Sequence, residues 1–204
     1  MHIRFFTLVA TMAIVACGAD PEAPPRDADP ETTDAEASPS ERLPERIVAP
    51  RDGFIPEGVE YDMTNGRLLT GSLSEGAIFH IEANGSVTPI ISDPDLVSSV
   101  GIEVDELRAR LLVANADRSV FDGGTTGQAM LGVYDLNNGE RIAMVDLATT
   151  VPQVSDDAAF FANDVAVADD GTVYVTDTRM NVIYHVDAQY QASLFHRFED
   201  DGAG

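Results

Sequence analysis

Short runs of alternating apolar and polar residues, separated by turn residues, recur along this chain. One stretch holds three of them, at Val165–Val167, Val173–Thr176 and Val182–Val186. Their β-branched and aromatic residues, bounded by Asp, Gly and Asn, are typical of strands and tight turns. No window there has the i, i+3, i+4 spacing of an amphipathic helix. With a fourth run at Ala192–Phe195, the stretch is predicted to form a four-stranded antiparallel sheet.

The same pattern occurs twice earlier, beginning at Gly58–Asp62 and at Gly101–Asp105. The two starting points are about forty residues apart, which is the period of a four-stranded propeller blade. The sequence therefore predicts an all-β fold, a β-propeller of four-stranded antiparallel blades. Three blades are expected, at about residues 55–93, 99–148 and 162–198.

Two insertions interrupt the repeat, at Asp117–Met130 and at Ala148–Ala162. In a blade meander, both would open on the face where each first strand begins. Long loops on one face of a rigid scaffold often carry function. Neutral loop growth would give the same pattern.

Charge and composition exclude some functions. The formal net charge is -23, which argues against nucleic acid as a partner, because phosphate binding needs a basic surface. All 12 basic residues counted as Lys or Arg are arginine, so lysine Schiff-base chemistry is excluded. The single cysteine cannot form an intrachain disulfide.

Residues 1–16 are predicted to be a signal peptide, because Arg4 precedes an apolar run too short to span a bilayer comfortably. The run ends in Ile14-Val15-Ala16-Cys17, which resembles the lipobox of bacterial lipoproteins. The resemblance implies cleavage before Cys17 and its lipidation, and hence a membrane anchor in the bacterial cell envelope. The outer membrane, facing the periplasm, is expected, because the two residues directly after Cys17 are Gly18 and Ala19 and not the Asp that retains lipoproteins in the inner membrane. A plain signal peptide is the alternative.

Residues 17–50 are predicted to be a disordered, acidic, proline-rich tether, because their composition cannot bury a core. Residues 51–204 would form the propeller. Three blades make about half of a ring, since propellers have four to eight blades. The expectation is therefore an incomplete ring, from a truncated reading frame or a fragment. A dimer that closes the ring is the alternative.

Alignment of the repeats places Glu57, Val100 and Asn163 at one register, just before each first strand. A carboxylate and an amide oxygen at the channel mouth are suitable ligands for Ca²⁺ or Mg²⁺. Each residue could instead simply stabilise its own turn.

The segment from Pro56 to Asp62 resembles the opening motif of the SMP-30/gluconolactonase/LRE-like family. The segment from Phe161 to Gly171 resembles that family's Asn-containing strand with the Asp-Gly turn that follows it. The resemblance implies a six-bladed propeller with a divalent metal ion, expected to be calcium, that hydrolyses lactones or related esters. It makes Glu57 a metal ligand. Asn163 matches either a metal-ligating Asn or one that contacts the substrate. No residue here matches the general base, so the catalytic residue stays unknown.

Arg118 and Arg179 follow second strands, which would place them on the same face as the candidate site. Either could bind an anionic substrate such as a sugar acid. Each could equally be a solvated loop arginine.

Two functions follow from these observations. The first is a lipid-anchored, metal-dependent lactone or ester hydrolase. The second is a non-catalytic propeller, like those of the NHL type, that binds ligands or proteins in the envelope. The sequence does not identify the substrate or the metal.

Overall fold

The computed structural model describes residues 43–123, 125–152, 155 and 158–199. The predicted signal peptide, Cys17 and most of the predicted tether lie outside these residues. Within the part of the chain described, no helix is both long and apolar enough to cross a membrane.

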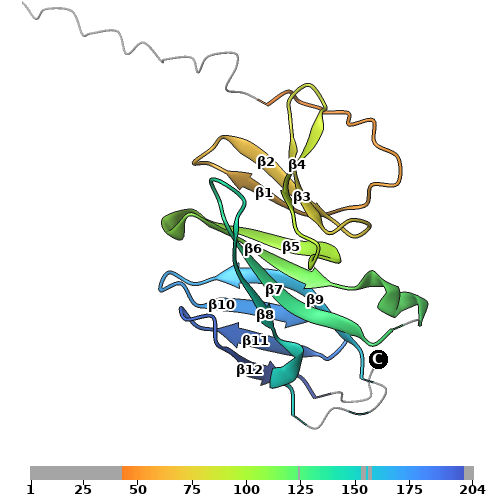
Figure 1. Ribbon diagram of the computed structural model, residues 1–204, viewed down its shortest axis with the longest axis vertical. Helices are drawn as coiled ribbons and strands as arrows, with labels where there is room; N and C mark the ends of the chain where they lie inside the picture. Colours follow the sequence, from red (N-terminus) through yellow and green to blue (C-terminus); the bar gives the residue numbers. More distant parts are fainter. Residues whose placement is uncertain (1–42, 124, 153–154, 156–157, 200–204) are drawn as a thin grey trace, which may run out of the picture. The chain divides into compact units, whose positions relative to one another are not determined.

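Twelve strands form three antiparallel meanders of four strands each, which we call blades 1, 2 and 3 (Figure 1). Blade 1 comprises β1 (Pro56–Asp62), β2 (Arg67–Ser72), β3 (Ala77–Ile81) and β4 (Val87–Ser92). Blade 2 comprises β5 (Ser98–Asp105), β6 (Arg110–Ala116), β7 (Gly127–Asp135) and β8 (Arg141–Asp146). Blade 3 comprises β9 (Phe160–Val167), β10 (Val173–Asp177), β11 (Val182–Val186) and β12 (Ala192–Arg197).

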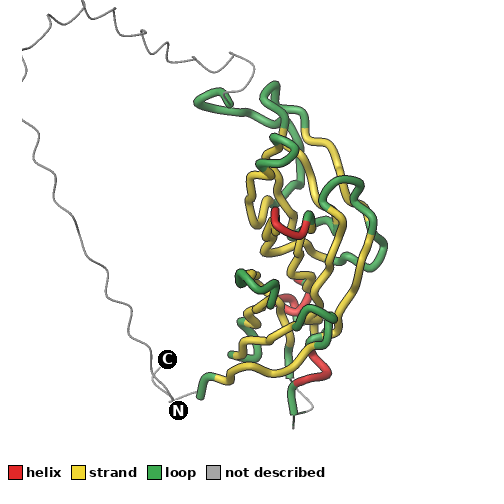
Figure 2. Tube along the Cα trace, turned by 90° about the vertical axis from the view of Figure 1, so that its left-hand side faces the viewer, coloured by secondary structure: helices red, strands yellow, loops and turns green. Residues whose placement is uncertain are grey.

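Three one-turn 3₁₀ helices lie in the connections, η1 (Glu106–Arg108), η2 (Arg118–Asp122) and η3 (Ala148–Thr150). The side view shows the blades following one another along an arc, with loops at both margins (Figure 2). The predicted succession of three four-stranded blades is confirmed. Val59, Ile102 and Val165 lie on β1, β5 and β9, the first strands of the three blades, which pack side by side.

Asp and Asn side chains fix the tight turns within the blades. Asn84 accepts a hydrogen bond from the backbone N–H of Ser86 at 2.7 Å, and Asp170 accepts one from Thr172 at 2.9 Å. Such turns replace a backbone partner by a short side chain, which is why Asn and Asp are favoured there. Both turns were predicted from the sequence as Asn-Gly and Asp-Gly pairs.

The hydrophobic core lies between the blades. Leu69 and Ile78 of blade 1 pack in one buried cluster with Leu111 of blade 2. A second cluster joins Leu112 of blade 2 to Val175 of blade 3. Full burial of one such side chain contributes roughly 1.5–3 kcal/mol. Each blade therefore depends on its neighbour for much of its stability.

A buried arginine also joins neighbouring blades. Arg110 Nε donates to Asp105 Oδ2 at 2.8 Å, and Arg110 Nη2 donates to the Gly171 carbonyl of blade 3 at 2.7 Å. One planar guanidinium can satisfy both acceptors because it presents several donors in a fixed geometry. The same bridge between blades 1 and 2 is formed by Asp62, Arg67 and the Leu136 carbonyl.

The second insertion ends earlier than Ala162, the end predicted from the sequence. β9 begins at Phe160, so the residues before Asn163 belong to a strand and not to the loop. Gly127 and Gln128 at the start of β7 pair in parallel with Phe160 and Phe161. This pairing extends β9 toward its N-terminus. The alternation of apolar and polar residues could not predict the extension, because the partner strand lies in another blade.

Candidate functional site

The first strands of the blades approach each other unusually closely at one register. A Cβ atom at Gly58 would lie 2.5 Å from the Val100 carbonyl oxygen, and one at Gly101 would lie 2.6 Å from that of Asn163. Only glycine permits such approaches of one backbone to the next. The register against the second strand shifts at the same place in all three blades. Such β-bulges redirect side chains and are common beside active sites.

The structure corrects the position of the three register-matched residues. Glu57, Val100 and Asn163 lie inside β1, β5 and β9, whereas the sequence predicted them just before these strands. The bulges explain the difference, because they interrupt the alternation by which the strand starts were assigned. Val100 is 1% exposed and belongs to the core, as expected for a residue that offers no ligand.

Glu57 and Asn163 are both half-buried. Glu57 lines a shallow hollow of about 300 Å³ with Val59, Thr70 and Ile81. Among the described residues, neither the Glu57 nor the Asn163 side chain makes a hydrogen bond. Their predicted convergence on one ion therefore stays a prediction.

A group of carboxylates on the first strands was not predicted as part of the site. Burial raises the pKa of Glu103 on β5, and the negative charges of Glu60, Asp164 and Asp105 raise it further. Burial also raises the pKa of Glu60 on β1, a hydrogen bond with the Tyr61 backbone opposes this, and Asp164 on β9 adds to the rise. We call Glu60, Glu103 and Asp164 the first-strand carboxylates. Carboxyl groups with a raised pKa, such as those of Glu60 and Glu103, occur preferentially at functional sites.

The sequence did carry a signal for two of these residues. Gly58-Val59-Glu60 and Gly101-Ile102-Glu103 place a Glu two residues after each closely packed glycine. The alignment of the repeats selected the residue directly before each glycine and not the glutamate two positions after it. Asp164 occupies the register of the glycines themselves, so it could not be found from the repeat.

The described residues do not complete a metal site. No three of their His, Cys, Asp or Glu side chains are grouped so that they could hold one ion. A calcium ion usually takes six to eight oxygen ligands, of which waters can supply only some. Glu57 and Asn163 alone are therefore too few donors for a tight site.

Arg118 and Arg179 lie where they were predicted, after β6 and after β10, and both are exposed. Arg179 Cζ lies 5.8 Å from the ring centroid of Phe121 in η2. The Phe121 ring in turn meets the ring of Phe161 edge-on, with centroids 4.9 Å apart. The sequence gave no reason to select Phe121, because an isolated aromatic residue in a loop has no characteristic spacing.

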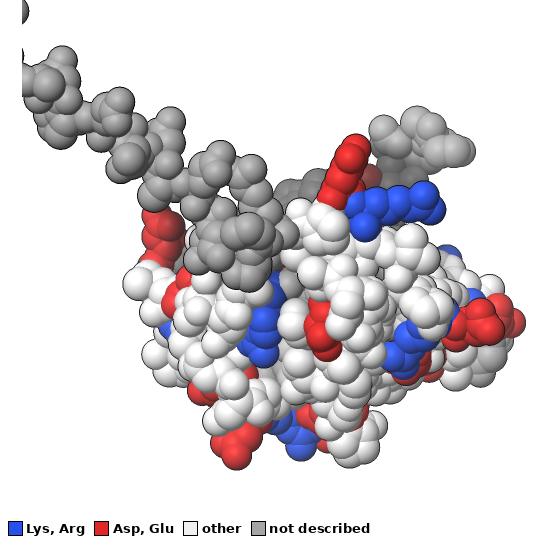
Figure 3. Space-filling view, turned by 90° about the horizontal axis from the view of Figure 1, so that it is seen from above, with Lys and Arg blue, Asp and Glu red and all other residues white. Residues whose placement is uncertain are grey.

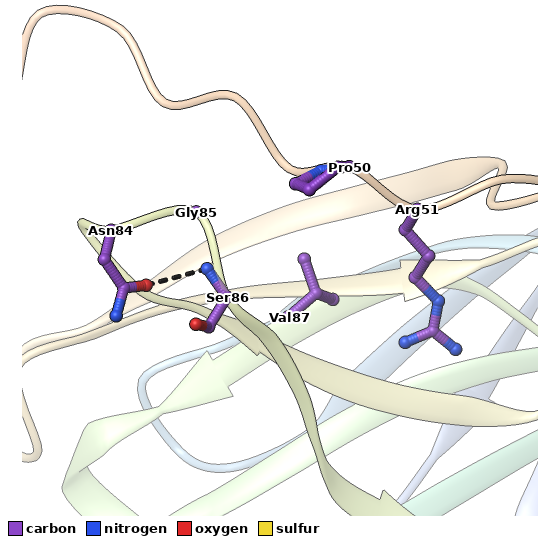
Figure 4. Close-up of a pocket in the computed structure, with 6 residues that line it drawn as sticks. All are labelled: Pro50, Arg51, Asn84, Gly85, Ser86 and Val87. Carbon is purple, nitrogen blue, oxygen red and sulfur yellow. Dashed lines mark hydrogen bonds between the residues drawn. The ribbon is translucent and has the colours of Figure 1, made fainter.

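Another hollow in the described part lies away from these residues. It measures about 400 Å³ and lies between Pro50 and Arg51 on one side and the turn at residues 84–87 on the other (Figure 4). The Arg51 guanidinium is bound by Glu75, at 2.6 and 2.9 Å, and lies 4.5 Å from the Phe79 ring centroid. Its charge is thus already neutralised, and the hollow carries no candidate chemistry.

Comparisons with known proteins bear on the fold. No family model matches the chain, and no curated protein matches it. Among solved structures, virginiamycin B lyase from Staphylococcus aureus is similar, with 12% identity, 78% of this chain and 46% of that chain covered, and a TM-score of 0.52. A protein from Lactobacillus plantarum is also similar, with 16% identity, coverage of 74% and 44%, and a TM-score of 0.51.

A gluconolactonase from Xanthomonas campestris matches with 15% identity, coverage of 72% and 48%, and a TM-score of 0.49. The chain thus spans about half the length of the solved structures that it matches. At these identities the two matches with TM-scores above 0.5 speak to the fold alone. Together with the three antiparallel blades, they show that this chain has the fold of a partial β-propeller.

Proposed function

We propose that the chain forms part of the active-site wall of a propeller hydrolase of the SMP-30/gluconolactonase type, acting on a lactone or related ester. The observation that carries the proposal is the group of first-strand carboxylates on three adjacent strands, in which burial, and then the charge of Asp164, raise the pKa of Glu60 and of Glu103. The motifs at residues 56–62 and 161–171 resemble those of this family and support its choice.

Proton transfer is the step for which these residues are suited. A carboxyl group with a raised pKa holds a proton at a pH where ordinary carboxylates have lost theirs, and it can then act as an acid or a base. We assign this role to Glu103, because burial and then three neighbouring carboxylates raise its pKa. No step is assigned to a metal ion, because the described residues do not complete a site for one.

The test is hydrolysis of a panel of sugar lactones and aryl esters by the protein as the cell makes it. We expect Glu103→Gln to lower kcat/KM by about 100-fold or more, the usual contribution of a positioned acid or base. Glu140→Gln, at an exposed turn position, is the matched control and should have no effect. Hydrolysis that is absent, or equal in the two variants, would overturn the proposal.

A second candidate function is binding of ligands or proteins by the propeller without catalysis. It is favoured by the exposed loop positions of Arg118 and Arg179. For residues 1–204 alone we expect weak calcium binding and no lactone turnover. Calorimetric titration combined with the lactone assay checks both. Micromolar binding, together with turnover abolished by Glu57→Gln, would show that three blades suffice.

We further propose that lipid on Cys17 anchors the protein in the cell envelope, with the outer membrane as its location. The support is the apolar run that ends in Ile14–Cys17 and the lack of any other cysteine. Several acyl chains on one residue give durable anchoring. Intact-mass analysis of the mature protein should show an acylated Cys17. A soluble protein with a free Cys17 thiol would exclude the anchor.

A further inference from the structure

We propose that Phe121 and Arg179, with Arg118 nearby, form a platform that binds a small ring-shaped carboxylate, the chemical class of the sugar acids. The platform goes beyond the proposed hydrolase, because binding there requires no turnover.

The aromatic part of the platform is open to solvent but held in place. Phe121 is 60% exposed, while Phe161, whose ring it meets at 62°, is only 3% exposed. An exposed aromatic ring alone would need no explanation. Here the ring is fixed against a buried partner, so its accessible surface has a defined orientation. A fixed apolar ring can stack against the C–H face of a pyranose or against another ring.

The cationic part of the platform has guanidinium N–H donors that no described carboxylate binds. The chain has 35 acidic residues against 12 arginines, and five arginines in the described part have a carboxylate partner. Arg118 and Arg179 make no ion pair with any described residue. The Arg179 guanidinium, 5.8 Å from the Phe121 centroid, can donate two parallel hydrogen bonds to a carboxylate.

Hydrogen bonds hold the described residues on either side of Phe121 in place. Asp117 caps η2 by accepting a hydrogen bond from the Ser119 backbone at 2.9 Å. The Thr125 hydroxyl donates to Asp117 Oδ2 at 3.3 Å and accepts from the Gly127 backbone at 3.1 Å. Gly127 then pairs with Phe160 of blade 3. These bonds link the described residues around Phe121 to both blade 2 and blade 3, and contacts that hold a binding surface in place lower the entropic cost of binding.

The Phe121 ring and the Arg179 guanidinium together select a ligand that has both a ring and a negative charge. A neutral sugar offers the ring without the charge, and acetate offers the charge without the ring. The net charge of -23 repels anions at long range, so that only direct contact with arginine can retain one. A hexuronate, which joins a carboxylate to a pyranose ring, satisfies both requirements.

Binding of D-glucuronate to the purified chain, followed by NMR or calorimetric titration, tests the platform. Glucose and acetate are the matched ligands. We expect glucuronate to bind at least about tenfold more tightly than either, because each lost contact is worth roughly 1.4 kcal/mol. Phe121→Ala and Arg179→Gln should each weaken glucuronate binding by about tenfold.

Phe195→Ala and Arg197→Gln are the control variants. Both residues are exposed, and Phe195 likewise meets a neighbouring ring, that of Tyr174, edge-on. The control variants should bind glucuronate like the parent chain. The proposal is overturned if glucuronate shows no saturable binding, if glucose binds equally well, or if the control variants weaken binding as much as the platform variants do. Circular dichroism of each variant checks that the fold is retained.

Discussion

Arg110 shows at the scale of a single residue how one side chain stabilises two blades. Both Arg110 and Asp105 are 4% exposed, so the ion pair between them is buried. Removing one partner of such a pair leaves an uncompensated buried charge, whose cost is typically about 3–5 kcal/mol. We therefore expect Arg110→Leu to lower the free energy of unfolding by about 3 kcal/mol, as measured by urea titration.

Arg197→Leu is the control for this prediction, because Arg197 is exposed and surface substitutions usually change stability by less than about 0.5 kcal/mol. Equal losses in the two variants would show that the bridge to Gly171 contributes nothing specific.

Glu103 leads to a prediction about pH at the same scale. Burial and nearby carboxylates raise its pKa in the folded state. A raised folded pKa means that the folded protein binds the proton more tightly than the unfolded chain does. This contribution stabilises the fold at low pH and is lost as the pH rises through the folded pKa. Glu103→Gln should therefore raise Tm at neutral pH more than at pH values below the ordinary pKa of glutamate.

Thermal unfolding of parent and variant over a series of pH values measures the effect. Asp62 should show the opposite trend. Burial acts to raise its pKa, but hydrogen bonds from Arg67 and Asn65 prevail and lower it. Its contribution is therefore present above its unfolded pKa and lost as the pH falls through the folded one. A Glu103→Gln variant whose Tm follows that of the parent at every pH would contradict the assignment.

At the scale of the strand, the close approach of β1 to β5 depends on Gly58. Its φ is 64°, which favours glycine, and a Cβ there would lie 2.5 Å from the Val100 carbonyl. Gly66 has a nearly identical φ of 63° but open space around its Cα. Gly66→Ala should thus cost only the backbone strain, about 1 kcal/mol. Gly58→Ala should cost more, because the two first strands must also move apart.

Chemical denaturation of the two variants separates strain from crowding. If the variants lose equal stability, the strands are not held at the distance that the structure shows. If Gly58→Ala also disturbs Glu60 and Glu103, the change should appear in the pH dependence of unfolding.

The strands themselves could be predicted well from the sequence, and the site less well. The local alternation in runs such as Val173–Thr176 predicts a strand, and the Asn-Gly and Asp-Gly pairs predict the turns. The start of β9 at Phe160 could not be predicted, because its partner Gly127 lies in another blade. The repeat carried a signal for Glu103, two residues after Gly101, but its neighbour Asp164 is distant in the sequence. Phe121 was missed because an isolated aromatic residue in a loop has no characteristic spacing, and its neighbour Arg179 lies in another blade.

At the scale of the whole molecule, blades 1 and 3 each present a face that no other blade of the described residues covers. Val59 is 65% exposed and Tyr61 45% exposed on β1, whereas Ile102, the equivalent of Val59 in blade 2, is 4% exposed. Uncharged side chains cover much of the blade 1 end of the molecule, with charged groups between them (Figure 3). Phe195, 58% exposed, lies on blade 3 at the other end.

Such apolar faces favour self-association. We expect the isolated chain to associate as its concentration rises, and Val59→Lys to reduce the association. Sedimentation velocity measures both effects. Leu107→Lys is the control, because Leu107 is 78% exposed but lies in η1. A chain that stays monomeric at all concentrations would show that these faces do not drive self-association.

The parallel pairing of β7 with β9 has a consequence for how the molecule opens. Blades 2 and 3 share two residue pairs of main-chain ladder and the larger buried cluster, while blades 1 and 2 share one pair, Ser72 with Ser99. In an array of repeats, the weakest junction sets the boundary of each cooperative unit. Blades 2 and 3 should consequently exchange their amide hydrogens as a single foldon, and blade 1 should become labile first while the rest stays protected.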